Sequence, residues 1–181
     1  MRRARRGDAE AYGELTARHR PAALRVATVV LGAPEGADDV VQQAVERAWR
    51  TIGRFEPGRA FRPWLLRIVA NAARNDRRSR GRRARLAVRA ASADERRHVT
   101  TPEEAAISDA ERRTVVAALN RLATPDRLVI ALRHFEQLSE QEMAEALDCA
   151  PGTVKSRLSR AMARLRDQLA RDVPEEVTGS A

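Results

Sequence analysis

An unbroken stripe of apolar residues, spaced three and four positions apart, runs through residues 38–52 and predicts an α-helix there. The stripe consists of Val40, Val41, Ala44, Val45, Ala48, Trp49 and Ile52. Asp38 and Asp39 precede it, where carboxylates suit the positive end of the helix dipole. Similar helical patterns follow Pro63 and recur after residue 112. Because aromatic residues make up only 3% of the chain, we expect an all-α fold.

The predicted helices group into two small helical domains joined by a flexible, arginine-rich linker. We expect a first domain at residues 1–80, the linker at 81–108, a second domain at 109–171 and a disordered tail at 172–181. Residues 81–100 lack apolar periodicity, which is the reason for placing the linker there. In the first domain, Pro21 is expected to break the helix of residues 15–31 or to begin a new one.

The positive charge of the chain is clustered. The formal net charge is +9, and Lys155 is the only lysine among the 34 basic residues. Residues 74–89 hold eight arginines and one acid, Asp76, while residues 155–166 hold five basic residues and no acid. Such clusters indicate a polyanionic partner, although a solvated helix face or a disordered basic tail would give the same pattern.

Several protein classes are excluded by what the sequence lacks. No apolar run approaches the roughly 20 residues that span a bilayer, so we expect no membrane insertion. The basic N-terminus is not followed by an apolar core, so we expect no secretory signal. Cys149 is the single cysteine, and no Cys/His pair has zinc-site spacing, so we expect no disulfide, metal or cofactor and a reducing compartment.

Residues 138–169 carry the most specific local motif. Ser139 and Glu142 form a capping box before a short helix, residues 148–150 make a tight turn, and Pro151 starts a second helix. This is the pattern of a helix-turn-helix, whose second helix lies in the major groove of DNA. The alternative is an ordinary helical hairpin with a basic surface; the acid-free start of the second helix favours DNA binding.

Four of the six aromatic residues fall within residues 49–64: Trp49, Phe55, Phe61 and Trp64. The two tryptophans fit the core stripes of their helices. Phe55 and Phe61 flank a loop that leads into an arginine-rich helix, where aromatic rings could stack on unpaired bases. Core packing explains the two phenylalanines equally well, so both interpretations stay open at this point.

Five segments together resemble the extracytoplasmic-function (ECF) sigma factors of bacterial RNA polymerase, which keep only regions 2 and 4. The segments are residues 7–15 (GDAEAYGEL), 37–50 (ADDVVQQAVERAWR), 61–71 (FRPWLLRIVAN) with Arg77 and Arg78, 138–147 (LSEQEMAEAL) and 152–158 (GTVKSRL). Their order and spacing are what make the resemblance specific, and it covers nearly the whole chain.

The resemblance implies a role for each segment. The helix of residues 38–52 would dock on the clamp of the polymerase β′ subunit through Asp38, Asp39, Gln42, Gln43 and Glu46. The loop and the helix that follow would capture the −10 promoter element through Phe55, Arg59, Ala60, Phe61, Trp64, Arg67, Asn71, Arg74, Asn75, Arg77 and Arg78. The second helix of the helix-turn-helix would read the −35 element through Thr153, Lys155, Ser156, Arg157, Ser159, Arg160 and Arg164.

The resulting hypothesis is a specificity subunit, with no chemistry of its own, that binds core RNA polymerase at the β′ clamp and β flap, recognises promoter DNA and promotes its melting. The resemblance also implies an anti-sigma factor and a cytoplasmic location, on the nucleoid when in holoenzyme. The alternative is a helix-turn-helix regulator that binds duplex DNA without docking on polymerase. An enzyme acting on DNA is disfavoured, because no nucleophile or metal cluster accompanies Asp38, Asp39 and Glu46.

Overall fold

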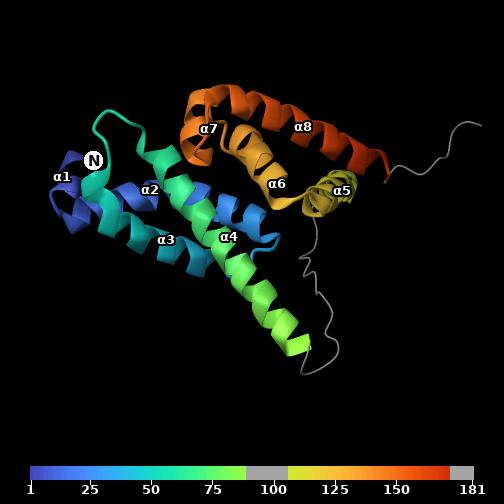
Figure 1. Cartoon of the computed structure of the whole chain (residues 1–181), viewed down its shortest axis with the longest axis horizontal. Helices are drawn as coiled ribbons and strands as arrows, with labels where there is room; N and C mark the ends of the chain where they lie inside the picture. The colour runs from blue at the N-terminus through green and yellow to red at the C-terminus, as the bar shows by residue number, and fades with distance from the viewer. Residues whose placement is uncertain (89–105, 172–181) are drawn as a thin grey trace, which may run out of the picture.

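The structure is a computed structural model, and it describes residues 1–88 and 106–171. All regular secondary structure within these ranges is helical, which confirms the predicted all-α fold (Figure 1). The elements are α1 (Arg2–Arg5), α2 (Ala9–Leu31), α3 (Ala37–Thr51), η1 (Ile52–Arg54), α4 (Phe61–Val88), α5 (Ala106–Arg121), α6 (Thr124–Ile130), η2 (Ala131–Phe135), α7 (Glu140–Leu147) and α8 (Pro151–Ala170). None of the helices in the described ranges is long and apolar enough to cross a membrane.

Helices α2, α3 and α4 pack against one another to form the N-terminal module, which includes α1 and η1 (Figure 1). The carboxylate of Asp8 caps α2 by accepting a hydrogen bond from the Ala11 amide at 2.9 Å. Helix α3 begins at Ala37, so Asp38 and Asp39 lie in its first turn as predicted. The side chains of Val26, Val41 and Leu65 are fully buried where the three helices meet.

The prediction of a break at Pro21 is wrong, because α2 runs through this residue without interruption. A proline inside a helix removes one backbone hydrogen bond and crowds the preceding turn. Pro21 is exposed, as is Ala17 one turn earlier, so water can reach the carbonyl that loses its partner. Packing of α2 against α3 and α4 outweighs the local cost.

Helix α4 begins at Phe61 and continues to Val88, eight residues past the boundary that we expected at residue 80. Arginine and alanine are strong helix formers, so a helix that is already packed can extend through a segment without apolar periodicity. The rest of the predicted linker to residue 105, and the predicted tail 172–181, lie outside the described residues.

The C-terminal module consists of α5, α6, the π-helical turn η2, α7 and α8. The capping box is confirmed: Ser139 Oγ accepts a hydrogen bond from the Glu142 amide at 3.3 Å, and Glu142 Oε2 accepts one from the Ser139 amide at 2.9 Å. Asp148 ends α7 in the left-handed conformation, with φ of 53°, and turns the chain into α8. The predicted helix-turn-helix is therefore present.

The C-terminal module packs against one side of the N-terminal module. Helix α4 contacts α7, and α2 contacts both α6 and η2 (Figure 1). Leu65 and Val26 of the first module and Leu128 and Leu138 of the second belong to one continuous apolar core. We call this the closed arrangement of the chain.

Candidate nucleic-acid interface

Helix α3 lies on the side of the N-terminal module away from α7 and α8 (Figure 1), and it carries an exposed polar face. All five side chains that we expected to dock on polymerase are exposed there: Asp38, Asp39, Gln42, Gln43 and Glu46. Asp38 accepts a hydrogen bond from Arg20 at 2.7 Å, and Gln42 donates one to Glu46 at 3.4 Å. The face is thus an acidic and amide-bearing surface on a helix whose opposite side is firmly packed.

The start of α8 presents the second candidate surface. Pro151 provides the first residue of the helix, and Val154, Ala161 and Leu165 are buried, which fixes the opposite face toward solvent. The exposed side chains are Lys155, Ser156, Arg157, Ser159 and Arg160, while Thr153 is half-buried. With no acid in this stretch, the surface is suited to phosphates and to the acceptor edges of bases in a major groove.

Arg164 differs from the other predicted contacts of α8. Its guanidinium donates a hydrogen bond to Asp126 Oδ2 of α6 at 2.7 Å, and the Asp126 side chain is largely buried. The side chain therefore ties α8 to α6 inside the C-terminal module. A role in DNA contact would require this ion pair to be broken or shared.

The aromatic residues around the loop between η1 and α4 form a packed cluster. The ring of Phe55 lies 5.2 Å from that of Trp64 and 6.1 Å from that of Phe61, both edge-on, and Phe61 also contacts His19. Phe55 is 2% exposed and Phe61 7% exposed, whereas Trp64 is half-buried. In the closed arrangement the two phenylalanines are core residues. The loop residues between the two rings, 56–60, are all exposed, and they include Arg59 and Ala60.

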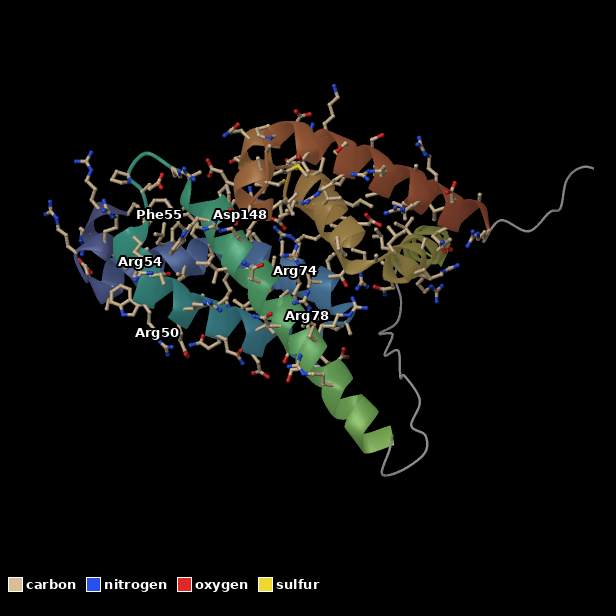
Figure 2. All side chains as sticks on the ribbon, in the orientation of Figure 1. Arg50, Arg54, Phe55, Arg74, Arg78 and Asp148 are labelled. Carbon is tan, nitrogen blue, oxygen red and sulfur yellow. The ribbon has the colours of Figure 1, made fainter. Side chains whose placement is uncertain are left out.

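The polar face of α4 runs toward the C-terminal module. Arg67 donates a hydrogen bond to Asp148 of the helix-turn-helix at 2.9 Å, and Arg74 donates one to Asn71 at 3.1 Å. Asn71, Asn75, Arg77 and Arg78 are exposed, and Arg74 is half-buried. Figure 2 shows Arg74 and Arg78 along α4, and Asp148, which ends α7, beside the earlier part of α4. The sequence predicts one polar face of this helix, and its five residues are exposed or half-buried on α4: Arg67, Asn71, Arg74, Asn75 and Arg78.

The amino-acid sequence of both modules matches known families. Residues 15–83 match the family Sigma-70 region 2, and residues 112–165 match the family Sigma-70, region 4. The ECF RNA polymerase sigma-E factor of Escherichia coli (strain K12) is 33% identical over 170 residues, which cover 89% of this chain and 87% of that protein. The chain belongs to the ECF sigma factors. The RNA polymerase sigma factor NccH of Alcaligenes xylosoxydans xylosoxydans is 38% identical over 167 residues, covering 91% of this sigma factor and 89% of NccH.

Two solved structures share the fold of this sigma factor over both modules. The sigma factor RpoE in complex with the anti-sigma factor NepR, from Bartonella quintana, gives a TM-score of 0.70 at 27% identity and covers 91% of this chain and 99% of RpoE. CnrH in complex with the cytosolic domain of CnrY gives a TM-score of 0.68 at 32% identity, covering 94% and 95%. Sequence and fold therefore agree that this chain is an RNA polymerase sigma factor of the ECF family.

Sequence reasoning missed the residues that hold the two modules of this sigma factor together. The carboxylate of Glu136 is fully buried and accepts hydrogen bonds from Arg25 of α2, at 2.7 and 3.2 Å, and from Arg62 of α4. The hydrogen bonds to Glu136 raise the pKa of Arg25 above its ordinary value. Nothing local marks this pairing, because Glu136 is 111 residues from Arg25 and 74 from Arg62.

A second contact between the modules joins α6 to the end of α2. Arg127, which is 2% exposed, donates a hydrogen bond to the Val30 carbonyl at 3.4 Å, and Arg77 of α4 donates to the same carbonyl at 3.3 Å. Burial lowers the pKa of Arg127, and the positive charge of Arg77 lowers it further. Two cations at the C-terminal end of α2 suit the negative end of its dipole.

Proposed function

We propose that residues 1–80 dock on core polymerase and open the −10 element, while residues 109–171 read the −35 element as duplex. The observation that carries the proposal is that one chain presents three surfaces of different character. The acidic and amide face of α3 lies apart from the basic face of α4 and from the exposed start of α8. A protein that must hold polymerase and two promoter elements at once needs three such surfaces.

On the −35 side, Lys155, Arg157 and Arg160 would neutralise phosphates or donate to guanine, and Ser156 and Ser159 would contact base edges. Ser156 Oγ already donates to the Thr153 carbonyl at 3.1 Å, so its oxygen remains free to accept. These side chains are exposed in the closed arrangement, which supports duplex binding without a change of shape.

On the −10 side, the closed arrangement covers part of the proposed surface. Arg67 is held by Asp148, and α7 lies against α4. Because Phe55 and Phe61 are core residues here, capture of a base on either ring requires the loop to move. Melting would follow from preferential binding of the opened strand over the duplex, so binding free energy shifts the equilibrium toward open DNA. In this proposal the chain supplies recognition and polymerase supplies the chemistry.

The partners of this sigma factor are then core polymerase, at the β′ clamp and β flap, and promoter DNA. The two solved neighbours were each captured with a second protein, RpoE with the anti-sigma factor NepR and CnrH with the cytosolic domain of CnrY. We extend this to an anti-sigma factor for the present chain. A sigma factor works where polymerase and DNA are, which places the chain in the cytoplasm.

The test is reconstitution with core RNA polymerase that has been freed of sigma factors. The wild-type chain should co-elute with core and start transcription at promoters that share a −35 and a −10 sequence. Asp38→Ala with Asp39→Ala should lower co-elution at least tenfold and leave binding to −35 duplex unchanged, because these side chains lie on α3.

The matched control is Glu140→Ala with Asp167→Ala, which removes two exposed acids of the C-terminal module and should keep co-elution. If the wild-type chain binds specific duplex DNA but neither co-elutes with active core nor starts transcription, the proposal fails. The chain would then act as a regulator that binds DNA independently of polymerase.

A further inference from the structure

A hollow of about 680 Å³ lies at the junction of the two modules, between the second half of α4 and the start of α6. Four arginines of α4 line it, together with a glycine and two residues of α6: Arg74, Arg77, Arg78, Gly81, Arg82, Thr124 and Pro125. Its walls therefore come from both modules, and it exists only when they are closed.

The positive charge in this hollow is not neutralised by any carboxylate of the described residues. Asp76 pairs with Arg80 at 2.5 Å, and Asp126 pairs with Arg164 at 2.7 Å, so the two nearby acids are engaged elsewhere. Arg74 and Arg77 donate only to neutral acceptors, which are the Asn71 amide, the Val30 carbonyl and the Thr124 hydroxyl. The hollow is thus a concave surface rich in guanidinium groups that have no carboxylate partner among the described residues.

Closure of the modules adds to this charge. Burial lowers the pKa of Arg74, and the positive charges of Arg78 and of Arg157, which comes from α8, lower it further. Arginines four residues apart on a helix repel one another, as Arg74, Arg78 and Arg82 do along α4. An anion in the hollow would remove this repulsion and would therefore stabilise the closed arrangement.

We propose that this hollow binds a small polyphosphate anion, either inorganic or carried on a nucleoside. Guanidinium groups form paired hydrogen bonds with phosphate oxygens, and a chain of phosphates can meet several arginines at once. The volume falls in the range of small-molecule sites and is too small for a DNA duplex. Because the ligand binds the closed arrangement, it favours that arrangement by mass action and competes with −10 DNA for Arg74, Arg77 and Arg78. The competition, but not the site, rests on the proposed function.

Gly81 gives a matched pair of variants. A Cβ added to it meets nothing within 4 Å, so a side chain can be placed at the hollow without a clash. Gly81→Glu brings a carboxylate to the four arginines, whereas Gly81→Ala adds only a methyl group. Arg54→Ala removes an exposed arginine from η1, which Figure 2 shows well away from Arg74 and Arg78.

The experiment is a calorimetric titration of the full chain with sodium tripolyphosphate, orthophosphate and adenosine triphosphate in 150 mM salt. We expect one tripolyphosphate per chain, bound at least tenfold more tightly than orthophosphate, with at least tenfold weaker binding in Gly81→Glu and less than a twofold change in Gly81→Ala and Arg54→Ala. Equal affinity for adenosine triphosphate would assign the site to the phosphate chain alone, and tighter binding would assign it to a nucleotide; either supports the proposal.

Absence of binding, several anions per chain, or equal weakening by Arg54→Ala would overturn it, since each would mean general attraction to a basic protein. Tighter binding of a glutamate-rich peptide than of tripolyphosphate would overturn it in favour of a protein partner. These titrations contain no polymerase, so their result is separate from that of the transcription test. If transcription fails and the titration succeeds, only the proposed competition with promoter DNA is lost.

Discussion

Glu136 Oε1 of the C-terminal module accepts a hydrogen bond from Arg25 Nε of the N-terminal module at 2.7 Å, although the two residues are 111 positions apart in the sequence. The Glu136 side chain is fully buried, whereas Arg25 is about half exposed, and Arg62 supplies a second cation. A buried carboxylate is costly unless it is paired, so these arginines decide whether closure is favourable. Separation of the modules would return Glu136 to water.

We predict that Arg25→Ala shifts the free chain toward an open form, at a cost to closure of about 1–3 kcal/mol, because one hydrogen-bonded cation of a buried carboxylate is lost. The measurement is the radius of gyration by X-ray scattering, with dyes on the two modules as a second readout. Adding Glu136→Gln to Arg25→Ala should recover part of the closure, since an amide is less costly to bury than a carboxylate. Arg18→Ala, which removes an exposed arginine from the same helix, should leave the radius unchanged; an equal increase would refute the assignment.

A second prediction concerns the aromatic cluster. Phe55→Ala should destabilise the N-terminal module by about 3–5 kcal/mol, because the ring is 2% exposed and packs against Phe61 and Trp64. Phe135→Ala, at a position that is 47% exposed, should cost less than 1 kcal/mol. Denaturant unfolding of both variants checks this. A small loss for Phe55→Ala would show that the ring leaves the core in solution, as base stacking would require.

The elements that the sequence predicted well are those with a local cause. The stripe in α3 and the capping box of Ser139 and Glu142 each require only residues a few positions apart, and both are present as predicted. The end of α4 and the passage of α2 through Pro21 were not predictable in this way. Packing against other helices outweighs the local cost of Pro21 in α2. The end of α4 extends because arginine and alanine are strong helix formers that continue a helix already packed.

The residues of the candidate interface also divide into those that could be chosen before the tertiary structure and those that depend on it. The residues of the α3 face came from the resemblance to sigma factors, and all five are exposed. Those at the start of α8, which are also exposed apart from the half-buried Thr153, could be chosen from helical spacing. The pairing of Glu136 with Arg25 and Arg62 could not, because it depends on how two separate modules meet. Arg164 shows the limit most clearly: its charge and position suggest a DNA contact, but only the tertiary structure places Asp126 beside it.

A third prediction separates the two kinds of arginine on α8. Arg160→Ala should weaken binding to a −35 duplex and reduce the slope of log affinity against log salt by about 1, because one phosphate contact is lost. Arg164→Ala should change that slope by less than half as much and instead destabilise the C-terminal module by about 1 kcal/mol, through loss of the ion pair with Asp126. Fluorescence anisotropy between 50 and 200 mM salt, paired with denaturant unfolding, measures both. A full unit of slope change for Arg164→Ala would place this residue on the DNA.

The last prediction concerns acid sensitivity at His19, whose ring contacts Phe61 at 5.6 Å. Burial lowers the pKa of His19 in the folded chain, and the positive charges of Arg62 and Arg18 lower it further. As pH falls, His19 is therefore protonated in the unfolded chain before it is protonated in the folded chain. The free energy of unfolding is then unaffected by His19 above about pH 6.5 and decreases below it. Urea unfolding of the wild type at pH 7.5, 6.5 and 5.5 should show the decline, and His19→Gln should reduce it. His134→Gln, which changes an exposed histidine of the C-terminal module, is the matched control and should keep the wild-type slope. If His19→Gln retains that slope in full, the ring is hydrated in solution and the packing around Phe61 is looser than the structure describes.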